Sequence, residues 1–175
     1  MPLTARLQGS FAATQTGASS AIDLGTVTPA TAVVARTGDL VLADGTGAGL
    51  SDVLYQDTNT LAASATIDID LAGALAGALG GTAVFARVKG LYIAAAAANT
   101  NNVVVGAAAT NAWATLFNAT GTLTLRPGAW VLLGTGGADA TGWAVTGGTG
   151  DLLRLTNGAA GTTVTYDIAI IGTSV

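Results

Sequence analysis

The sequence pattern is clearest near the C-terminus, where residues 162–171 read Thr-Thr-Val-Thr-Tyr-Asp-Ile-Ala-Ile-Ile. Apolar and polar side chains alternate along this stretch, with Val164, Tyr166 and Ile168 on one face and Thr165 on the other. A repeat of two residues is typical of a β-strand with one buried face, because successive side chains of a strand point to opposite sides of its sheet. The stretch therefore predicts an antiparallel strand that borders a hydrophobic core.

The residues just before this stretch predict a second strand. It covers residues 151–156, and Asn157-Gly158 after it predicts a turn, so we expect the two strands to form a hairpin. Similar alternation recurs upstream in residues 66–71, 82–93, 122–126 and 130–133. Gly90, inside the second of these, predicts a bulge or a close approach of another backbone. Short strands separated by turn residues are typical of an all-β domain.

One segment departs from this pattern. Residues 71–79 space their leucines four apart, which favours a short helix. Gly73 and Gly77 oppose it, since each glycine costs a helix about 1 kcal/mol relative to alanine.

The first 50 residues differ in character from the rest, and no strong core pattern precedes Leu50. Two interpretations stay open: an extended arm laid across a neighbouring molecule, or an ordinary N-terminal sheet of the same domain. The predicted division is an N-terminal arm or anchoring segment over residues 1–50 and an antiparallel β-sandwich domain over residues 51–175, a length that can bury a core.

Charge is sparse. Only 9% of the 175 residues are charged, against about a quarter in a typical soluble domain. All the acidic residues are aspartate, and Lys89 is the single lysine. A GC-rich genome, which enriches alanine and glycine, accounts for part of this composition. The remainder suggests a surface that other subunits cover, so we expect a homo-oligomer, with a trimer as the first expectation.

Several classes of function are disfavoured by what the chain lacks. It contains no His and no Cys, which removes the commonest general base, thiolate chemistry and cysteine-based zinc sites. A net charge of −4 argues against a nucleic-acid partner, because phosphate binding needs clustered Lys and Arg. We therefore expect no enzyme activity, no cofactor and no metal.

No membrane partner is expected either. The most apolar stretch, residues 91–98, is far shorter than the roughly 20 apolar residues of a spanning helix. The first residues lack the basic and apolar regions of a signal peptide, so the chain is expected to be made and kept in a cytoplasm until something releases it.

Two pairs of charged residues are candidate subunit contacts. Asp68 and Asp70 lie two apart, and their carboxylates raise the alternatives of a glycosidase pair or a calcium site. Both carboxylates point the same way from one strand, so a solvated strand face is the favoured interpretation. Arg87 and Lys89 form the only basic pair, and we expect them either to meet the Asp68 and Asp70 face across a sheet or to contact a neighbouring subunit.

Trp143 is the candidate for an exposed contact residue, because it lies between glycine-rich stretches that predict flexible turns. An exposed aromatic side chain suits a carbohydrate-binding surface, so a host glycan is an alternative partner.

Residues 55–173 resemble a group of small virion proteins of tailed bacteriophages and phage-like elements. The similar stretches are residues 60–61 and 68–73, residues 85–93, residues 99–106, Arg126-Pro127-Gly128, and residues 165–172. The resemblance implies a jelly-roll-like β-sandwich that assembles as a multimer on the head or tail, and it implies no active-site residues.

The expected function is accordingly structural. The first expectation is a capsid decoration or head-spike protein, located in the virion and assembled in the host cytoplasm, that contacts its own copies and the major capsid or other virion proteins. The alternatives are a tail or fibre protein that binds host carbohydrate, and a tail-tube or connector protein with residues 37–49 as a long insertion loop.

Overall fold

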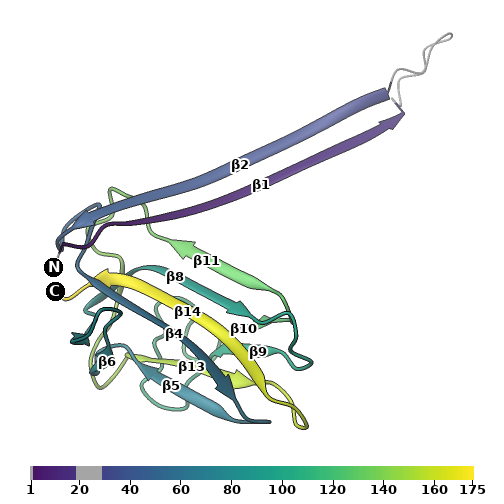
Figure 1. Cartoon of the computed structure of the whole chain (residues 1–175). Coiled ribbons are helices and arrows are strands. Elements are labelled where there is room, and N and C mark those ends of the chain that lie inside the picture. The colour runs from purple at the N-terminus through teal and green to yellow at the C-terminus, as the bar shows by residue number, and fades with distance from the viewer. Residues whose placement is uncertain (1, 19–28) are drawn as a thin grey trace.

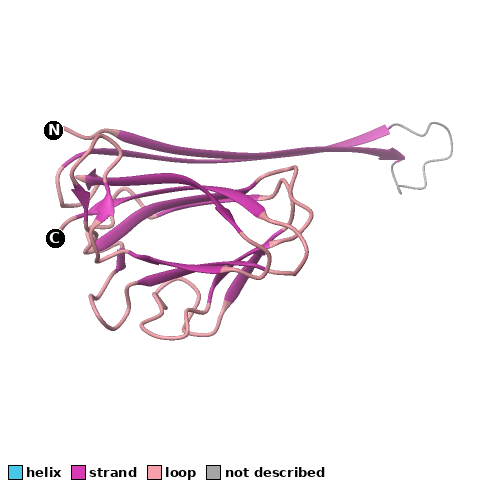
Figure 2. Ribbon diagram, turned by 60° about the horizontal axis from the view of Figure 1, so that its bottom comes forward, coloured by secondary structure: helices cyan, strands magenta, loops and turns pink. Residues whose placement is uncertain are grey.

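The computed structural model describes residues 2–18 and 29–175, and in these ranges every regular element is a β-strand (Figure 1). Two larger antiparallel sheets lie one over the other, and a pair of long N-terminal strands runs along the outside of one of them (Figure 2). The all-β class expected from the alternation is therefore confirmed.

The sheet beside the N-terminal strands is called here the ribbon-side sheet. It contains, in spatial order, β11 (Trp130–Gly134), β8 (Arg87–Ala95), β14 (Val164–Thr173) and β4 (Val53–Leu61), and β12 (Trp143–Ala144) pairs with the start of β8. The strand β14 has the alternation predicted for it, because Val164, Tyr166, Ile168 and Ile170 are buried. This part of the prediction is confirmed.

The second sheet is called here the far sheet. It contains, in spatial order, β10 (Thr122–Leu125), β9 (Val103–Gly106), β13 (Leu152–Asn157) and β5 (Thr66–Asp70). Apolar side chains from both sheets form one buried cluster, in which Leu155 and Val88 are fully buried. Because each strand contributes alternate residues, the two sheets cover each other's apolar faces.

The predicted C-terminal hairpin is wrong, although both of its strands exist. The strand β13 pairs with β5 and β9 in the far sheet, whereas β14 pairs with β4 and β8 in the ribbon-side sheet. The buried Asn157 accounts for the crossing, because its side-chain amide donates hydrogen bonds to the carbonyl oxygens of Ala62 and Thr162, at 2.9 and 2.7 Å. The two apolar faces therefore meet across the core rather than side by side.

Two further local predictions are corrected. The stretch 82–93 is not one strand but β7 (Thr82–Ala83) followed by β8, and Phe85 between them turns into the core. The stretch 71–79 is not helical: Leu71 is buried and β6 (Leu75–Ala76) pairs with β7. Strand pairing and the burial of Leu71 stabilise this extended conformation more than a helix would, because the two glycines destabilise the helix.

The N-terminal strands form a long antiparallel ribbon, called here the ribbon. It consists of β1 (Ala5–Ala18) and β2 (Pro29–Asp44), which pair along their whole length, and β3 (Leu50–Ser51) joins the end of β2 in parallel. Residues 37–44 belong to β2, so the long insertion loop expected over 37–49 is reduced to the short turn at 45–49. The ribbon extends well past the sheets (Figure 2).

Candidate interaction surface

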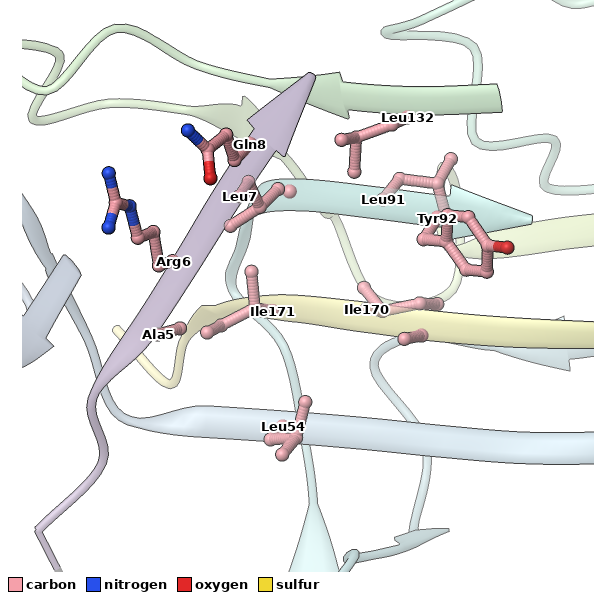
Figure 3. Close-up of a pocket in the computed structure, with 12 residues that line it drawn as sticks. Ala5, Arg6, Leu7, Gln8, Leu54, Leu91, Tyr92, Leu132, Ile170 and Ile171 are labelled. Atoms are coloured by element: carbon pink, nitrogen blue, oxygen red, sulfur yellow. The ribbon is translucent and has the colours of Figure 1, made fainter. Parts of the chain in front are cut away.

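The base of the ribbon lies on the outer face of the ribbon-side sheet. Leu40 and Leu42 from β2 and Ile171 from β14 are buried together, and Leu7 packs against them. Figure 3 shows Leu7 and Ile171 close together where β1 crosses the sheet. This small second core ties the ribbon to the sheet through apolar contact.

Gly90 makes this contact possible. The register between β8 and β14 shifts beside Gly90, and this shift is a β-bulge. A Cβ atom on Gly90 would overlap the side chains of Leu7 and Ile171. The expectation of a bulge or a close approach at Gly90 is therefore confirmed. The approaching group is Leu7 of the ribbon, which the sequence alone did not identify.

An ion pair lies on the opposite side of the ribbon base. Arg6 donates two hydrogen bonds of 2.8 Å to the carboxylate of Asp39 across the two strands. These hydrogen bonds lower the pKa of Asp39 and raise the pKa of Arg6. Both side chains are exposed to solvent, which screens the pair, so it aligns the strands without tying the ribbon to the sheet.

Beyond its base the ribbon has no other strand beside it within the described residues. Gly9 and Gly38 face each other where the ribbon leaves the sheet, and the side chains that follow are exposed. Phe11 is 62% exposed on the face that carries Leu7, and Val33 is 69% exposed on the other face. An isolated two-stranded hairpin is marginally stable in water. The ribbon therefore presents apolar side chains on both faces without the second layer that normally covers them.

Two grooves separate the ribbon from the sheet beneath it. The first, of about 320 Å³, lies under residues 5–8 and is bordered by Leu132 and Tyr92, which Figure 3 shows beyond Leu7. The second, of about 620 Å³, lies between Phe11 and the edge strand β11, whose Trp130 is 59% exposed. The ribbon and the sheet edge thus form one open, largely apolar surface.

A third hollow, of about 440 Å³, opens on the outer face of the ribbon-side sheet away from the ribbon. Its lining includes Tyr92 and Asp167, whose side chains point outward from the sheet. Asp57 also borders the hollow, but it pairs with the core residue Ile168, so its side chain points to the other face of the sheet, where it accepts a hydrogen bond from Tyr55. Asp167 accepts a hydrogen bond of 2.6 Å from the hydroxyl of Thr58. Asp167 forms no ion pair with any cation in the described parts of the chain, so the hollow combines one carboxylate with an aromatic ring.

The structure places the candidate basic pair away from the candidate acidic pair. Arg87 and Lys89 belong to β8 of the ribbon-side sheet, whereas Asp68 and Asp70 belong to β5 of the far sheet. The expected meeting of the two pairs across a sheet is therefore wrong. Each of the four has a different local partner.

Lys89 is buried rather than presented at the surface. It is the extra residue of the β8 bulge, 1% exposed, and its ammonium group donates a hydrogen bond to the backbone carbonyl of Asp139 in the loop above it. Burial lowers its pKa. The prediction that Lys89 is a surface contact is therefore wrong, because the loop that carries Asp139 and Gly142 covers its side chain. Arg87 instead donates a hydrogen bond of 2.6 Å to a C-terminal oxygen of Val175.

Asp68 and Asp70 are engaged within the far sheet. Asp68 accepts two hydrogen bonds of 2.7 Å from Arg154 on the neighbouring β13. Asp70 accepts a hydrogen bond from the backbone of Ala72 at the end of β5. Both remain at the surface, and no group of three or more metal-ligating acidic side chains occurs among the described residues.

The exposed tryptophan is Trp130, not Trp143. Trp143 is half-buried, because it packs against the main core and lies on β12 paired with Val88. Trp113 is buried and donates a hydrogen bond of 2.8 Å to the carbonyl of Ala144. The glycine-rich surroundings of Trp143 predicted a mobile turn, but strand pairing with β8 holds this residue against the core.

The residues that the sequence analysis missed are Phe11, Arg36, Tyr92 and Trp130. A loose alternation of Ala5, Leu7, Gly9 and Phe11 was the only signal for the ribbon. Its partner β2 is the next strand along the chain, but no turn motif in the sequence between them marks the pairing.

Comparisons with known proteins do not assign the chain to a family. No protein-family model matches it, and no curated protein or solved structure matches it. No helix among the described residues is long and apolar enough to cross a membrane. The features that bear on function are the ribbon, the sheet beneath it and the hollow on the outer face of that sheet.

Proposed function

We propose that this chain is a non-enzymatic structural component of a bacteriophage particle, a capsid decoration or head-spike protein that stabilises the shell through multimeric contacts. The observation that carries the proposal is the ribbon, which leaves its own sheets with Phe11 and Val33 exposed on opposite faces. No other strand among the described residues covers it, so we propose that another molecule supplies the second layer. A protein built in this way functions in an assembly.

The strand order supports the finer proposal of a jelly roll. When the eight principal strands are numbered along the chain from β4 to β14, the ribbon-side sheet has the order 6-3-8-1 and the far sheet the order 5-4-7-2. This is the order of an eight-stranded jelly roll, an architecture found in viral capsid and lectin domains. The fold supports a virion role but does not assign one, because the same fold occurs in proteins of different function.

The composition supports assembly independently of the fold. Only 9% of the residues are charged, and the apolar side chains Phe11, Val41 and Trp130 are all about 60% exposed. Exposed apolar patches of this kind mark interaction sites. The proposed partners are further copies of the chain, with a trimer as the expected state, and the major capsid or other virion proteins.

A shortened ribbon tests the proposal. Because Gly9 and Gly38 lie opposite each other, deleting residues 10–37 and joining these two glycines leaves a two-residue Gly-Gly turn of the type that closes hairpins. The base of the ribbon, with Leu7 and Leu40, remains. We expect the full chain to copurify with particles and the shortened chain to be lost from them. Equal copurification of both would contradict the role of the ribbon, and absence of the full chain from particles would contradict the virion assignment.

A carbohydrate-binding tail or fibre protein is the second candidate, favoured by the aromatic ring of Tyr92 and the carboxylate of Asp167 in the hollow. Glycan-array binding that Tyr92→Ala abolishes, and that Trp143→Ala leaves intact, would favour it. A tail-tube or connector role is the remaining alternative, in which the ribbon would link successive rings.

A further inference from the structure

We propose that the ribbon of one copy docks on the ribbon-side sheet of a second copy, with Arg36 entering the hollow to pair with Asp167 and Phe11 packing beside Tyr92. The inference rests on the proposed assembly function and names the partner of the ribbon. It follows from three features of the molecule: the donor face, the receiving hollow, and their separation within one chain.

The donor face combines an aromatic ring with a cation. Phe11 of β1 lies directly opposite Arg36 of β2, so both side chains project from the same face of the ribbon, the face that carries Leu7 and Leu40. Both side chains are exposed. Arg36 forms no ion pair with any carboxylate in the described residues; its guanidinium donates a hydrogen bond to the carbonyl of Ala35.

The receiving hollow has the complementary chemistry. Asp167 supplies a carboxylate on the outer face of the sheet, and the ring of Tyr92 supplies a flat apolar wall. A guanidinium group binds carboxylates in a forked geometry and also stacks on aromatic rings. The hollow, of about 440 Å³, has room for an arginine side chain with an adjoining aromatic ring.

A chain cannot place its own Arg36 in its own hollow. Arg36 borders the groove beside the edge strand β11, whereas the hollow lies over β4, β14 and β8, and the two cavities share no lining residue. Beyond Gly9, residues 10–18 of β1 extend about 30 Å at about 3.3 Å per residue, and four strands span only about 19 Å. The projecting ribbon is therefore long enough to cross the sheet of a neighbouring copy.

The contact would continue one that the fold already makes. At its base the same face of the ribbon packs on the same outer face of the sheet, through Leu7, Leu40 and Ile171. Because the donor and receiving surfaces differ, the contact is heterologous and extends from copy to copy until a ring closes. This geometry is compatible with the expected trimer.

Charge reversal tests the contact on the purified full chain. Arg36→Asp and Asp167→Arg each place like charges in the hollow, and we expect each to weaken self-association at least about tenfold, as measured by sedimentation over a range of concentrations. The double variant restores an opposite-charge pair and should return to within a few-fold of the unchanged chain. Arg126→Asp, an equal change of charge at an exposed turn, is the matched control and should have little effect. Circular dichroism verifies that each variant is folded.

Disulfide trapping provides a second readout, because the chain contains no cysteine. Mixing Arg36→Cys with Asp167→Cys chains under mild oxidation should give a covalent dimer of the two different variants. The pair Arg126→Cys and Asp167→Cys should not.

Three results would overturn the docking proposal: a chain that stays monomeric at all concentrations, single reversals without effect, or a double variant as weak as the single ones. A monomeric chain that still binds particles through its ribbon would point to the shell as the partner and leave the proposed function standing. Conversely, the double reversal could restore self-association while the chain is absent from particles. That result would overturn the proposed function and leave the docking proposal standing.

Discussion

Phe85 and Phe11 are the same residue type in two regions of the molecule with opposite surroundings. Phe85 is 1% exposed between the two sheets, whereas Phe11 is 62% exposed on the ribbon. Both regions are made of antiparallel strands with paired backbones, so hydrogen bonding does not distinguish them. The difference is a second layer: the sheets cover each other, and the ribbon beyond Gly9 has no strand layer over it within the described residues.

The sheets therefore stabilise the chain, whereas the exposed side chains of the ribbon are available for the proposed contacts with other copies. Burial of apolar surface is the dominant favourable term in folding. In the single chain most of the Phe11 ring is exposed, so it contributes little burial energy to folding. The same ring would contribute this energy when another molecule covers it. Substitutions in the core are therefore expected to destabilise the fold, whereas substitutions on the ribbon are expected to weaken the proposed assembly.

The largest expected effect comes from truncating the two phenylalanines. Phe85→Ala should lower the free energy of unfolding by about 3–5 kcal/mol, because it leaves a cavity in the core. Phe11→Ala should change it by no more than about 0.5 kcal/mol in the monomer, because the ring is already in water. Denaturant titration at a concentration where the chain is monomeric measures both.

If Phe85→Ala does not fold, Phe85→Leu, which keeps most of the volume, provides a milder measurement of the same site. Comparable losses for Phe11→Ala and Phe85→Ala would mean that the ribbon is part of the folding core.

A smaller effect is expected from alkaline pH, which acts on the sheets alone. Burial raises the pKa of Tyr166 to about 12, and nearby Tyr55 and Asp57 add to the rise. Unfolded tyrosine titrates near pH 10, so the unfolded chain loses this proton first. The stability gained is complete below about pH 10 and is lost as the pH rises from about 10 to about 12, by roughly 2–3 kcal/mol.

Tyr166→Phe should remove most of that pH dependence in denaturant titrations. The lowered pKa of Lys89 acts in the opposite direction, since stability rises with pH as the buried ammonium group loses its proton. The difference between the unchanged chain and Tyr166→Phe isolates the tyrosine. Residues 5–44 contain no tyrosine or lysine, so the shortened-ribbon variant should keep the full pH dependence. Its loss in that variant would contradict the assignment to the core.

The smallest effect concerns two ion pairs of the same geometry. Asp68 and Arg154 pair on the far sheet with partly shielded side chains, whereas the side chains of Arg6 and Asp39 on the ribbon are more exposed, at 58% and 42%. Asp68→Asn should cost about 0.5–1 kcal/mol at low salt and less at high salt. Asp39→Asn should leave global unfolding unchanged. A double-mutant cycle with Arg154→Gln gives the pair energy, and a larger cost at Asp39 than at Asp68 would reverse the comparison.

The sequence predicted individual strands better than their partners. Alternation located β5, β10, β11, β13 and β14 within a residue or two, and the buried face of β14 was assigned correctly. The hairpin between β13 and β14 failed because a turn after Asn157 is equally compatible with a connection between sheets. Hydrogen bonds from Asn157 to Ala62 and Thr162 hold the connection between the sheets, and Ala62 is distant in the sequence while Thr162 lies beyond the turn.

The candidate site was predicted less well than the fold. Lys89 was interpreted as a surface residue because charged side chains usually are, but the bulge at Gly90 places it under the loop that carries Asp139. Trp143 was chosen for its glycine-rich surroundings, whereas Trp130 on the edge strand β11 is the exposed one. Exposure depends on which loops and strands cover a residue, and local composition does not contain that information.

By itself the sequence determined the all-β class, the strands with one buried face, and the lack of His and Cys that restricts the chemistry available to the chain. Only the tertiary structure decided which sheet each strand joins, that Lys89 is covered, which tryptophan is exposed, and that Phe11 faces the same side as Arg36. The physical reason is that alternation with a period of two specifies a buried face but not its partner. Backbone hydrogen bonds are alike for every strand pair, so the choice of partner depends on how the apolar faces of the whole chain cover one another.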